Sequence, residues 1–369
     1  MSLAMDKSRK AVEELKAAIL SGKFSSGNFP SIAMIMARFG LARATAVKVR
    51  DELKSQRLIV GKVGKGTFIT RRAMSRKIGL IVPSIIGSEF FPVVVSETAK
   101  VIRENGYTLQ FADFQLCASS AGLGDEVMAF VDGLIKDKVC GVIFQPLEFL
   151  SDLTEKNQEI VNLFKRANIP VVLACCDFVK PPDRSGYDVI GINNVEAGAM
   201  MARHLVDSGV RRICFLMRPN RGMSIRSRFR GVVMALGCED RVRCTCDQLV
   251  AEVDDLPAVK RLLRCRRPDA FICGSDSDAA KFKITLEKAG LKVPDDVMLA
   301  GFNDVQMASI LTPSLTSIRI PCKEIAATAF YRLLARIANP DLPAMECLLP
   351  VRLVARGSTI RPKGKARHR

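Results

Sequence analysis

Apolar residues return at helical spacing through the first part of the chain, and small residues interrupt them at short intervals. This pattern predicts one helix over Asp6–Leu20, ended by Ser21-Gly22, a second over Ile32–Phe39 and a third from about Arg43 to Ser55. Gly40 separates the second helix from the third. Two short helices around a tight turn form a helix-turn-helix, in which the second helix enters the major groove of DNA.

The segment that follows, residues 58–70, has the pattern of a hairpin. Its sequence LIVGKVGKGTFIT predicts two short strands joined by Gly64-Lys65-Gly66. A hairpin with a basic tip beside a helix-turn-helix is a wing, which would place Lys65 against phosphate or in the minor groove.

From residue 77 onward, apolar runs typical of buried strands alternate with amphipathic stretches typical of helices. The first round contains KIGLIVP, YTLQFAD, CGVIFQP and IPVVLAC, with helices expected at about 92–105, 124–136 and 155–167. The second contains YDVIGIN, RRICFLM, PDAFICG and VMLAGF, with helices expected at about 196–208, 229–236, 256–263 and 278–289. Continuous apolar strands indicate parallel sheets covered on both faces, so the pattern predicts an α/β protein with two similar lobes behind its N-terminal domain.

Charge marks the same division. The 369 residues carry a net charge of +18, of which +11 falls in residues 1–76 and +5 in the last nine residues, so that 77–360 carries only +2. A basic excess at one end of a chain is typical of a domain that binds a polyanion. The basic tail 361–369 by itself is interpreted as a solvated end.

Composition excludes several kinds of site. All 12 cysteines fall between residues 77 and 360, most of them in apolar runs and none in a CxxC motif, which indicates buried, reduced thiols. Only His204 and His368 are present, so we expect no zinc site, no histidine-based triad and no cofactor. GKVGKG lies in the predicted hairpin and does not fit a phosphate-binding loop. No apolar run is long enough to span a bilayer and no signal peptide is evident, so the chain is expected to be cytoplasmic.

Residues 6–70 resemble the winged helix-turn-helix of GntR-type regulators. The resemblance rests on ARFG at the turn, on DEL followed by LI at the exit of the third helix, and on GKGTF in the wing. It implies a set of DNA-contacting residues, two for bases or backbone and three basic ones for phosphates: Arg43 and Thr45, then Lys48, Lys62 and Lys65. Ala33 and Val47 stand where the family usually has arginine, which predicts a different base preference. The alternative for this segment is a small helical module that binds protein.

Residues 78–360 resemble the sensor domain of LacI-type regulators, which shares the fold of the periplasmic sugar-binding proteins. The motifs that carry the resemblance, in order, are IGLIVP, GVIFQP, HLVDSGVRRI, SRFRG, RPDAFICGSD, GLKVPDDVMLAGFND, LTPSLTSIRIP and RGST. The resemblance implies crossings between lobes near Ile192-Asn193, near Ser317–Ile320 and near Asn339–Pro343. It gives a first lobe of about 78–192 and 320–340 and a second of about 193–318 and 345–360, behind a DNA-binding domain over 1–70 and a linker over 71–77.

The same resemblance implies a ligand in the cleft between the lobes, beyond the carboxyl ends of the strands. Residues at the matching positions are Phe90, Phe91, Asp177, Asn193, Arg228, Ser275, Asp276 and Asn303. Carboxylates, amides and a guanidinium suit the hydroxyl groups of a sugar, and an aromatic face covers its C–H surface. Each residue also has a structural alternative: lobe core for the phenylalanines, helix caps for the aspartates, a surface charge for Arg228. We favour that alternative for Asp177 and Asn193, and the ligand role for Arg228, Asp276 and Asn303.

A GntR-type head joined to a LacI-type sensor resembles the arabinose-responsive repressors. The resemblance implies a homodimer that holds two heads over a palindromic operator in double-stranded DNA, with no membrane partner. A small-molecule effector would shift its operator affinity; a carbohydrate is expected, and purine-like effectors use the same cleft. The alternative is a sugar-binding protein without regulatory DNA binding. An aminotransferase-like enzyme is excluded, because the sensor motifs account for the chain behind the head and no nucleophile–base pair stands out.

Overall fold

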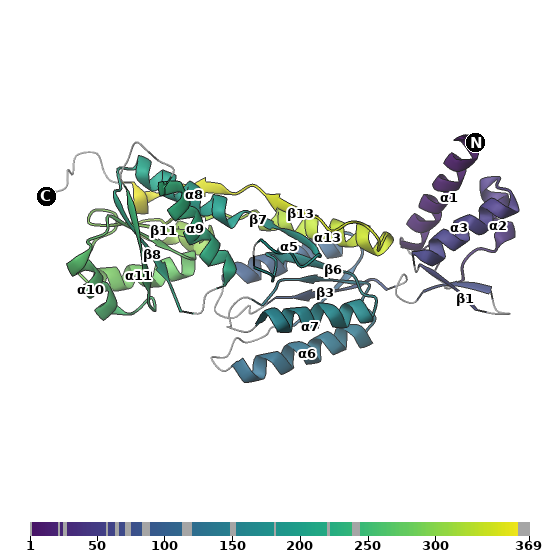
Figure 1. Cartoon of the computed structure of the whole chain (residues 1–369), viewed down its shortest axis with the longest axis horizontal. Helices are drawn as coiled ribbons and strands as arrows, with labels where there is room; N and C mark the ends of the chain where they lie inside the picture. Colours follow the sequence, from purple (N-terminus) through teal and green to yellow (C-terminus); the bar gives the residue numbers. More distant parts are fainter. Residues whose placement is uncertain are drawn as a thin grey trace.

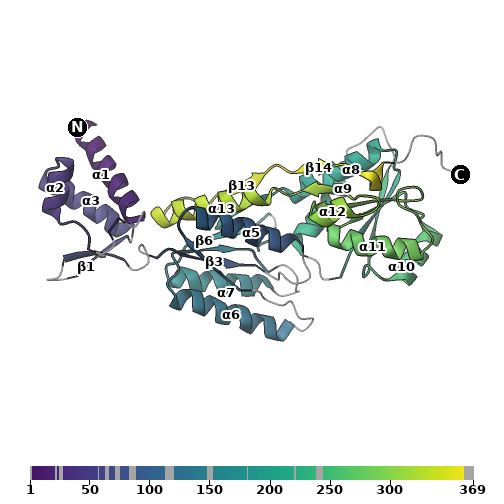
Figure 2. The same cartoon turned by 180° about the vertical axis from the view of Figure 1, so that it is seen from behind.

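The chain folds into a helical head followed by two sheet-based lobes (Figure 1). The computed structural model describes residues 2–20, 23–24, 28–56, 58–62, 66–70, 75–82, 89–112, 120–147, 153–180, 182–219, 222–237 and 244–360. The head and the lobes lie in a row, and the view from behind shows the same order (Figure 2). Lys65 at the tip of the expected wing, part of the expected linker and the basic tail 361–369 lie outside the described residues.

The head consists of three helices and a two-stranded antiparallel hairpin. These elements are α1 (Ser2–Leu20), α2 (Ile32–Phe39), α3 (Arg43–Ser55), β1 (Ile59–Lys62) and β2 (Gly66–Ile69). Ser31 caps α2 by accepting a hydrogen bond from a backbone amide, and Gly40 turns the chain at φ +60°, a conformation that glycine adopts without steric cost. The helices bury one apolar core that contains Leu15, Ile35 and Leu53. The predicted boundaries of α2 and α3 are confirmed.

The first lobe is a six-stranded parallel sheet in the order β13-β7-β6-β5-β3-β4. Its strands are β3 (Lys77–Ile81), β4 (Thr108–Phe111), β5 (Gly141–Phe144), β6 (Val171–Cys175), β7 (Asp188–Ile192) and β13 (Glu346–Leu349). One face carries α5 (Phe90–Glu104) and α13 (Cys322–Ala338), and the other carries α6 (Ser120–Lys136) and α7 (Leu153–Arg166). Every residue of β5 is buried, because helices cover the sheet on both sides.

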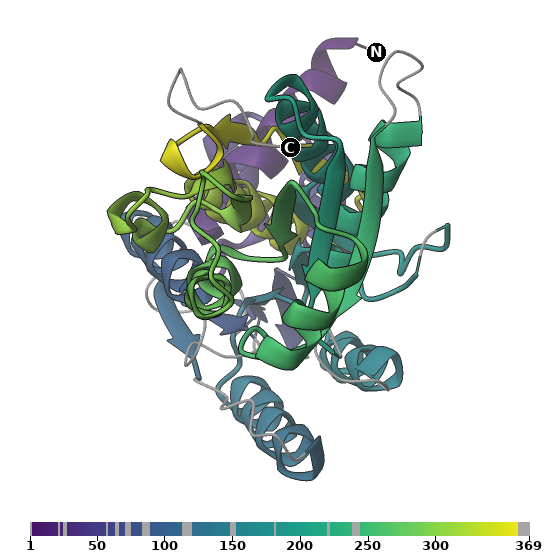
Figure 3. The same ribbon diagram turned by 90° about the vertical axis from the view of Figure 1, so that its left-hand side faces the viewer.

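The second lobe repeats this plan in the order β14-β12-β11-β10-β8-β9, with only β14 antiparallel to its neighbour. Its strands are β8 (Arg212–Met217), β9 (Thr245–Val250), β10 (Ala270–Cys273), β11 (Met298–Asn303), β12 (Thr316–Arg319) and β14 (Arg352–Val354). One face carries α8 (Asn194–Asp207) and α9 (Met223–Gly237), and the other carries α10 (Leu256–Cys265) and α11 (Asp276–Lys288). The short elements α12 (Gln306–Ile310) and η1 (Gly357–Thr359) complete it, and Figure 3 looks onto this lobe along the long axis.

Helices α8 and α9 touch through their backbones. A Cβ atom added at Gly198 would lie 1.9 Å from the carbonyl oxygen of Arg228, and one added at Gly231 would lie 1.9 Å from that of Val195. Only glycine fits at either position, so the crossing fixes where Arg228 sits relative to the start of α8.

The chain crosses between the lobes after β7, after β12 and after β13. The first two crossings lie where the sequence predicts them. The third was expected near Asn339–Pro343, but Glu346–Leu349 pairs with β7 in the first sheet, so the chain returns between β13 and β14. Assigning all of 345–360 to the second lobe is therefore wrong for this strand. Its side chains alternate between exposed and partly buried, as at a sheet edge, and an edge strand needs no continuous apolar run that would reveal it.

The predicted α/β architecture with two parallel-sheet lobes is confirmed, and each apolar run predicted as a strand contains one. Several helices begin earlier than predicted, among them α6 at Ser120 and α9 at Met223. Strand β9 and helix α13 were not predicted.

Candidate functional site

A cavity of about 260 Å³ lies between the lobes. Helix α5 lines it from the first lobe with Phe90, Val93 and Glu97, and the segment 303–305 after β11 lines it from the second. Residues 319–324, where the chain crosses from β12 into α13, complete the wall. The structure thus brings together two predicted ligand residues, Phe90 and Asn303, at the carboxyl end of a strand, where open α/β sheets bind ligands.

Arg228 reaches the same region from α9 and is only 6% exposed. Its Nε donates to Asn194 Oδ1 at 2.9 Å, and its Nη1 donates to the Gly274 carbonyl oxygen at 2.8 Å and to Asn303 Oδ1 at 3.4 Å. The guanidinium also lies 4.8 Å from the centre of the Phe302 ring. These contacts fix the orientation of Arg228 and place it directly beside Asn303.

Two residues at the end of β11 have a left-handed backbone. Asn303 has φ +106° and Asp304 has φ +52°, and Cys175, at the end of β6 in the first lobe, has φ +67°. Residues other than glycine adopt such values at a cost of about 1–3 kcal/mol each. Positive φ values also occur after helices, at Lys138, Asn168 and Arg267, so the distinctive point here is that Asn303 and Asp304 are adjacent and both line the cavity.

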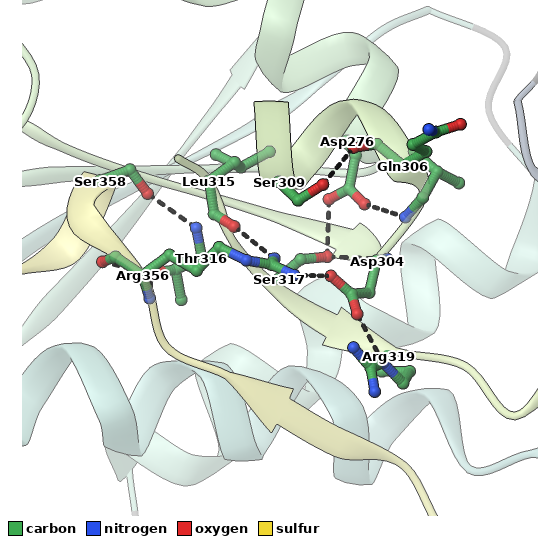
Figure 4. Close-up of polar contacts among 11 residues, drawn as sticks. Asp276, Asp304, Gln306, Ser309, Leu315, Thr316, Ser317, Arg319, Arg356 and Ser358 are labelled. Atoms are coloured by element: carbon green, nitrogen blue, oxygen red, sulfur yellow. Dashed lines mark hydrogen bonds and ion pairs between the residues drawn. The ribbon is translucent and has the colours of Figure 1, made fainter. Parts of the chain in front are cut away.

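Asp276 lies behind the cavity and is fully buried. Its Oδ1 accepts a hydrogen bond from the Ser317 hydroxyl at 2.7 Å, and its Oδ2 accepts one from the Val305 amide at 3.0 Å (Figure 4). Burial raises the pKa of this carboxyl to about 7 in spite of those bonds. Because both oxygens are held by the protein, Asp276 supports the loop after β11 and the crossing strand β12, and it does not line the described cavity.

Asp304 forms a second anchor of the crossing. Its carboxylate pairs with Arg319 Nε at 2.6 Å and with Arg356 Nη2 at 2.7 Å, and its amide donates to Ser317 Oγ at 3.0 Å (Figure 4). The Ser317 hydroxyl therefore connects the two aspartates in one network. Asp304, Ser317 and Arg356 lie in the motifs GFND, LTSIR and RGST, and the sequence alone indicated no role for them.

The remaining predicted ligand residues make contacts within the protein. Asn193 caps α8 by accepting from two amides at 3.1 Å, and Ser275 caps α11 by accepting from one amide at 3.1 Å. The Asp177 carboxylate accepts from both the amide and the hydroxyl of Ser185 at 3.1 Å, which shapes the loop after β6. Phe91 is 7% exposed and belongs to the apolar core. The sequence favours a structural role for Asp177 and Asn193, but the helix cap expected of Asp177 is wrong, because its carboxylate bonds within the loop between β6 and β7.

Gln145 is a polar residue that sequence reasoning did not single out. It follows β5 at the carboxyl edge of the first sheet and is 2% exposed, with its Nε2 3.5 Å from Cys176 Sγ. Its Oε1 has no hydrogen-bond partner among the described residues. A buried acceptor without a partner is unfavourable, and Gln145 does not line the described cavity.

The head presents basic side chains on α3 and on the hairpin. Arg43 and Lys48 are exposed, and Thr45 is partly buried beside them. The ammonium nitrogen of Lys62 lies 5.1 Å from the centre of the Phe68 ring, which holds this side chain along the hairpin. These positions leave the positive charge accessible to a polyanion.

The described residues also bear on membrane-spanning helices, metal sites and reactive thiols. No helix there is long and apolar enough to cross a membrane, and no group of three histidine, cysteine or acidic side chains is placed to hold a metal ion. Burial raises the pKa of the Cys246 thiol to about 12 and that of Cys214 still further, so neither is an activated nucleophile.

Known proteins share this architecture. Residues 202–359 match the family described as periplasmic binding protein-like domain. The chain is 27% identical to the HTH-type transcriptional repressor PurR of Vibrio campbellii over 72% of this chain and 76% of that protein. It is 25% identical to the arabinose metabolism transcriptional repressor of Geobacillus stearothermophilus over 94% of this chain and 96% of that one.

Solved structures agree with these matches at the level of the fold. A complex of the transcriptional regulator CelR with cellobiose has a TM-score of 0.63 at 20% identity, covering 89% of this chain and 100% of that one. A LacI family transcriptional regulator from Enterococcus faecium with bound ribose has a TM-score of 0.61 at 21% identity, covering 78% and 100%. The two lobes therefore share the periplasmic-binding-protein-like fold, and the named relatives from sequence comparison are transcriptional repressors.

Proposed function

We propose that this chain is a transcription repressor whose N-terminal head binds operator DNA under the control of a small molecule held between the lobes. The observation that carries the proposal is the match to the arabinose metabolism transcriptional repressor, because it spans 94% of the chain and so includes the head as well as the lobes. The match to PurR, over 72% of the chain, adds a second repressor with the same two-lobed body.

A carbohydrate is the effector that the cleft suits best. Solved structures of this fold hold ribose and cellobiose. Here Asn303 lines the cavity with Arg228 bonded beside it, and the Phe90 ring can cover C–H surface. Carboxylates of Glu97 and Asp304 also line the wall and can accept from hydroxyl groups, and Asp276 acts behind them by holding the loop that carries Asn303.

We assign the head to the GntR-type winged helix-turn-helix. Helices α2 and α3 around the turn at Gly40, followed by the β1–β2 hairpin, support this assignment. Arg43 and Thr45 would contact bases or backbone, and Lys48, Lys62 and Lys65 would contact phosphates. A homodimer would place two such heads over a palindrome, and an effector that prefers one lobe geometry would change operator affinity through coupling of about 1–3 kcal/mol.

The test begins with selection of duplexes from a random library by the full chain, followed by thermal shift against a panel of sugars and nucleobases. We expect an enriched palindromic duplex, and one sugar class that raises the melting temperature and changes duplex affinity. Lys48→Ala should weaken binding to every duplex and reduce the slope of log affinity against log salt by about 1, whereas Lys10→Ala on α1 should not. A sugar hit without any enriched duplex would contradict the repressor proposal and favour a sugar-binding protein that does not regulate through DNA.

A further inference from the structure

The first lobe contains one long excursion of the chain that starts and ends at the crossings. After β12 the chain crosses over, follows α13 away from the interlobe cavity, turns at residues 339–345 and returns along β13 to the third crossing. Helix α13 has 17 residues, which corresponds to a rod of about 25 Å. Its first turn lines the interlobe cavity, and both views show its far end directed at the head (Figures 1 and 2).

The turn of this excursion forms one wall of a second cavity, of about 730 Å³, between the head and the first lobe. We call it the junction cavity. The head lines it with the end of α3 and the base of the hairpin, through Ser55, Gln56, Leu58 and Thr70. The first lobe lines it with the end of α7 and the start of β6, with residues 185–187 before β7, and with Arg336, Ile337, Pro340 and Asp341 at the end of α13 and the turn after it.

A buried ionic cluster organises the lobe side of the junction. Asp188, the first residue of β7, is fully buried and pairs with Arg332 at 2.8 Å and with Arg336, both on α13. It also accepts from the amide of Met345, next to the start of β13, at 3.0 Å. Arg336 in addition donates to the carbonyl oxygen of Pro340 in the turn at 3.1 Å. The cluster therefore ties together β7, α13 and β13, which are the three elements of the first lobe that lead to the three crossings.

The head side of the junction is not fully satisfied. The Nε2 of Gln56 donates to Glu52, but its Oε1 is buried and has no hydrogen-bond partner among the described residues. An unpaired buried acceptor makes the docked arrangement less favourable than a fully bonded one. A small movement of the wall can therefore shift the balance between docked and released positions of the head.

We propose that the junction cavity is the docking site of the head on the first lobe, and that the α13–β13 excursion, fastened by Asp188, carries lobe movement from the cleft to the head. This proposal rests on the proposed function, because it explains how an effector would reach the DNA-binding head. Asp188, Arg332 and Arg336 are positioning residues in it, since they touch neither effector nor DNA.

The absence of tryptophan from the sequence allows a direct test on the full chain. Ser55→Trp places a sole indole in the junction cavity, which has room for it, and Asp341→Trp places one from the lobe side. Met34→Trp on α2 is the control, because Met34 is 62% exposed and does not line the cavity. A docked head predicts blue-shifted emission and reduced acrylamide quenching for both junction reporters relative to the control.

The second arm perturbs the cleft. Val93→Phe enlarges an exposed side chain in the interlobe cavity, and Val233→Phe enlarges an exposed side chain on α9 that does not line this cavity. We expect Val93→Phe to change the emission and quenching of both junction reporters and Val233→Phe to change neither. Junction reporters that behave like Met34→Trp, or that ignore Val93→Phe, would overturn the proposal. Neither DNA nor sugar is present in this measurement, so such a result would leave the proposed function untouched. The proposed function is contradicted only if the duplex selection enriches no duplex.

Discussion

Replacement of Asp276 by asparagine should change how the stability of this protein depends on pH. The carboxyl is fully buried, and burial raises its pKa to about 7 from an ordinary 3.8. In the unfolded chain the same group ionises near its ordinary value. Between these two values the folded chain binds more protons than the unfolded chain, so stability falls as pH rises through this range and is constant above it.

The size of the effect follows from the two pKa values. Ionisation of the group in the unfolded chain lowers the free energy of unfolding by about 2 kcal/mol at pH 5 and by about 4 kcal/mol at pH 8. Wild-type protein should therefore lose roughly 2–3 kcal/mol between these pH values through Asp276, and asparagine should lose none of it. For a body of this size the loss corresponds to about 4 °C in melting temperature.

The assay is urea denaturation followed by far-ultraviolet circular dichroism at both pH values. The stability difference between Asp276→Asn and wild type should shift in favour of asparagine by roughly 2–3 kcal/mol from pH 5 to pH 8. Asp207→Asn, at an exposed position on α8, controls for a general loss of negative charge. A stability difference that is the same at both pH values would refute the view that Asp276 is a buried group with a raised pKa.

Three other substitutions test the packing, each by urea denaturation. Gly198→Ala would push a methyl group into the Arg228 carbonyl, so it should lower the free energy of unfolding by about 1–3 kcal/mol and weaken binding of the proposed sugar. Gly237→Ala places its new Cβ with no atom within 4 Å and should do neither. Equal effects would show that α8 and α9 do not touch. Gly133→Ala, inside α6 and also without a close neighbour, should stabilise by about 0.5–1 kcal/mol, and a loss would mean that this helix is crowded. Phe330→Ala, at a fully buried position on α13, should lower the free energy of unfolding by about 3–5 kcal/mol; a change below 1 kcal/mol would contradict its burial.

The sequence predicted the central strands because burial on both faces demands continuous apolar residues. Strand β10 is buried at every residue and is plain in PDAFICG. The edge strands are not buried on both faces and therefore need no continuous apolar run. Strand β9, Thr245–Val250, mixes exposed and partly buried residues without regular alternation and carries Asp247 and Gln248, so its pattern does not differ from that of a loop. Strand β13 was not predicted for the same reason, and the third crossing was therefore placed too early in the chain.

The sequence leads to the cavity wall where a residue projects from a strand end, but it gives no signal where distant motifs meet. Asn303 follows directly from its place after VMLAGF, and Arg228 lies against it. That Asp276 is sealed behind them depends on the Ser317 hydroxyl, 41 residues further along the chain, and no local pattern shows this pairing. The Asp188 cluster likewise joins β7 to residues more than a hundred positions later.

Two buried aspartate networks hold the segments that cross between the lobes. Asp304 ties β12 to Arg356 beyond β14 in the second lobe, while Asp188 ties α13 and the start of β13 to β7 in the first. Buried ion pairs stabilise little compared with apolar residues of similar volume, but removing one partner is strongly destabilising, so their main effect is to enforce one geometry. Each network therefore keeps the crossing segments in register within its own lobe. Flexibility is left to the few residues between β12 and α13 and between β13 and β14. A movement of the second lobe therefore acts on the first lobe through the two ends of the α13–β13 excursion, whose turn lines the junction cavity.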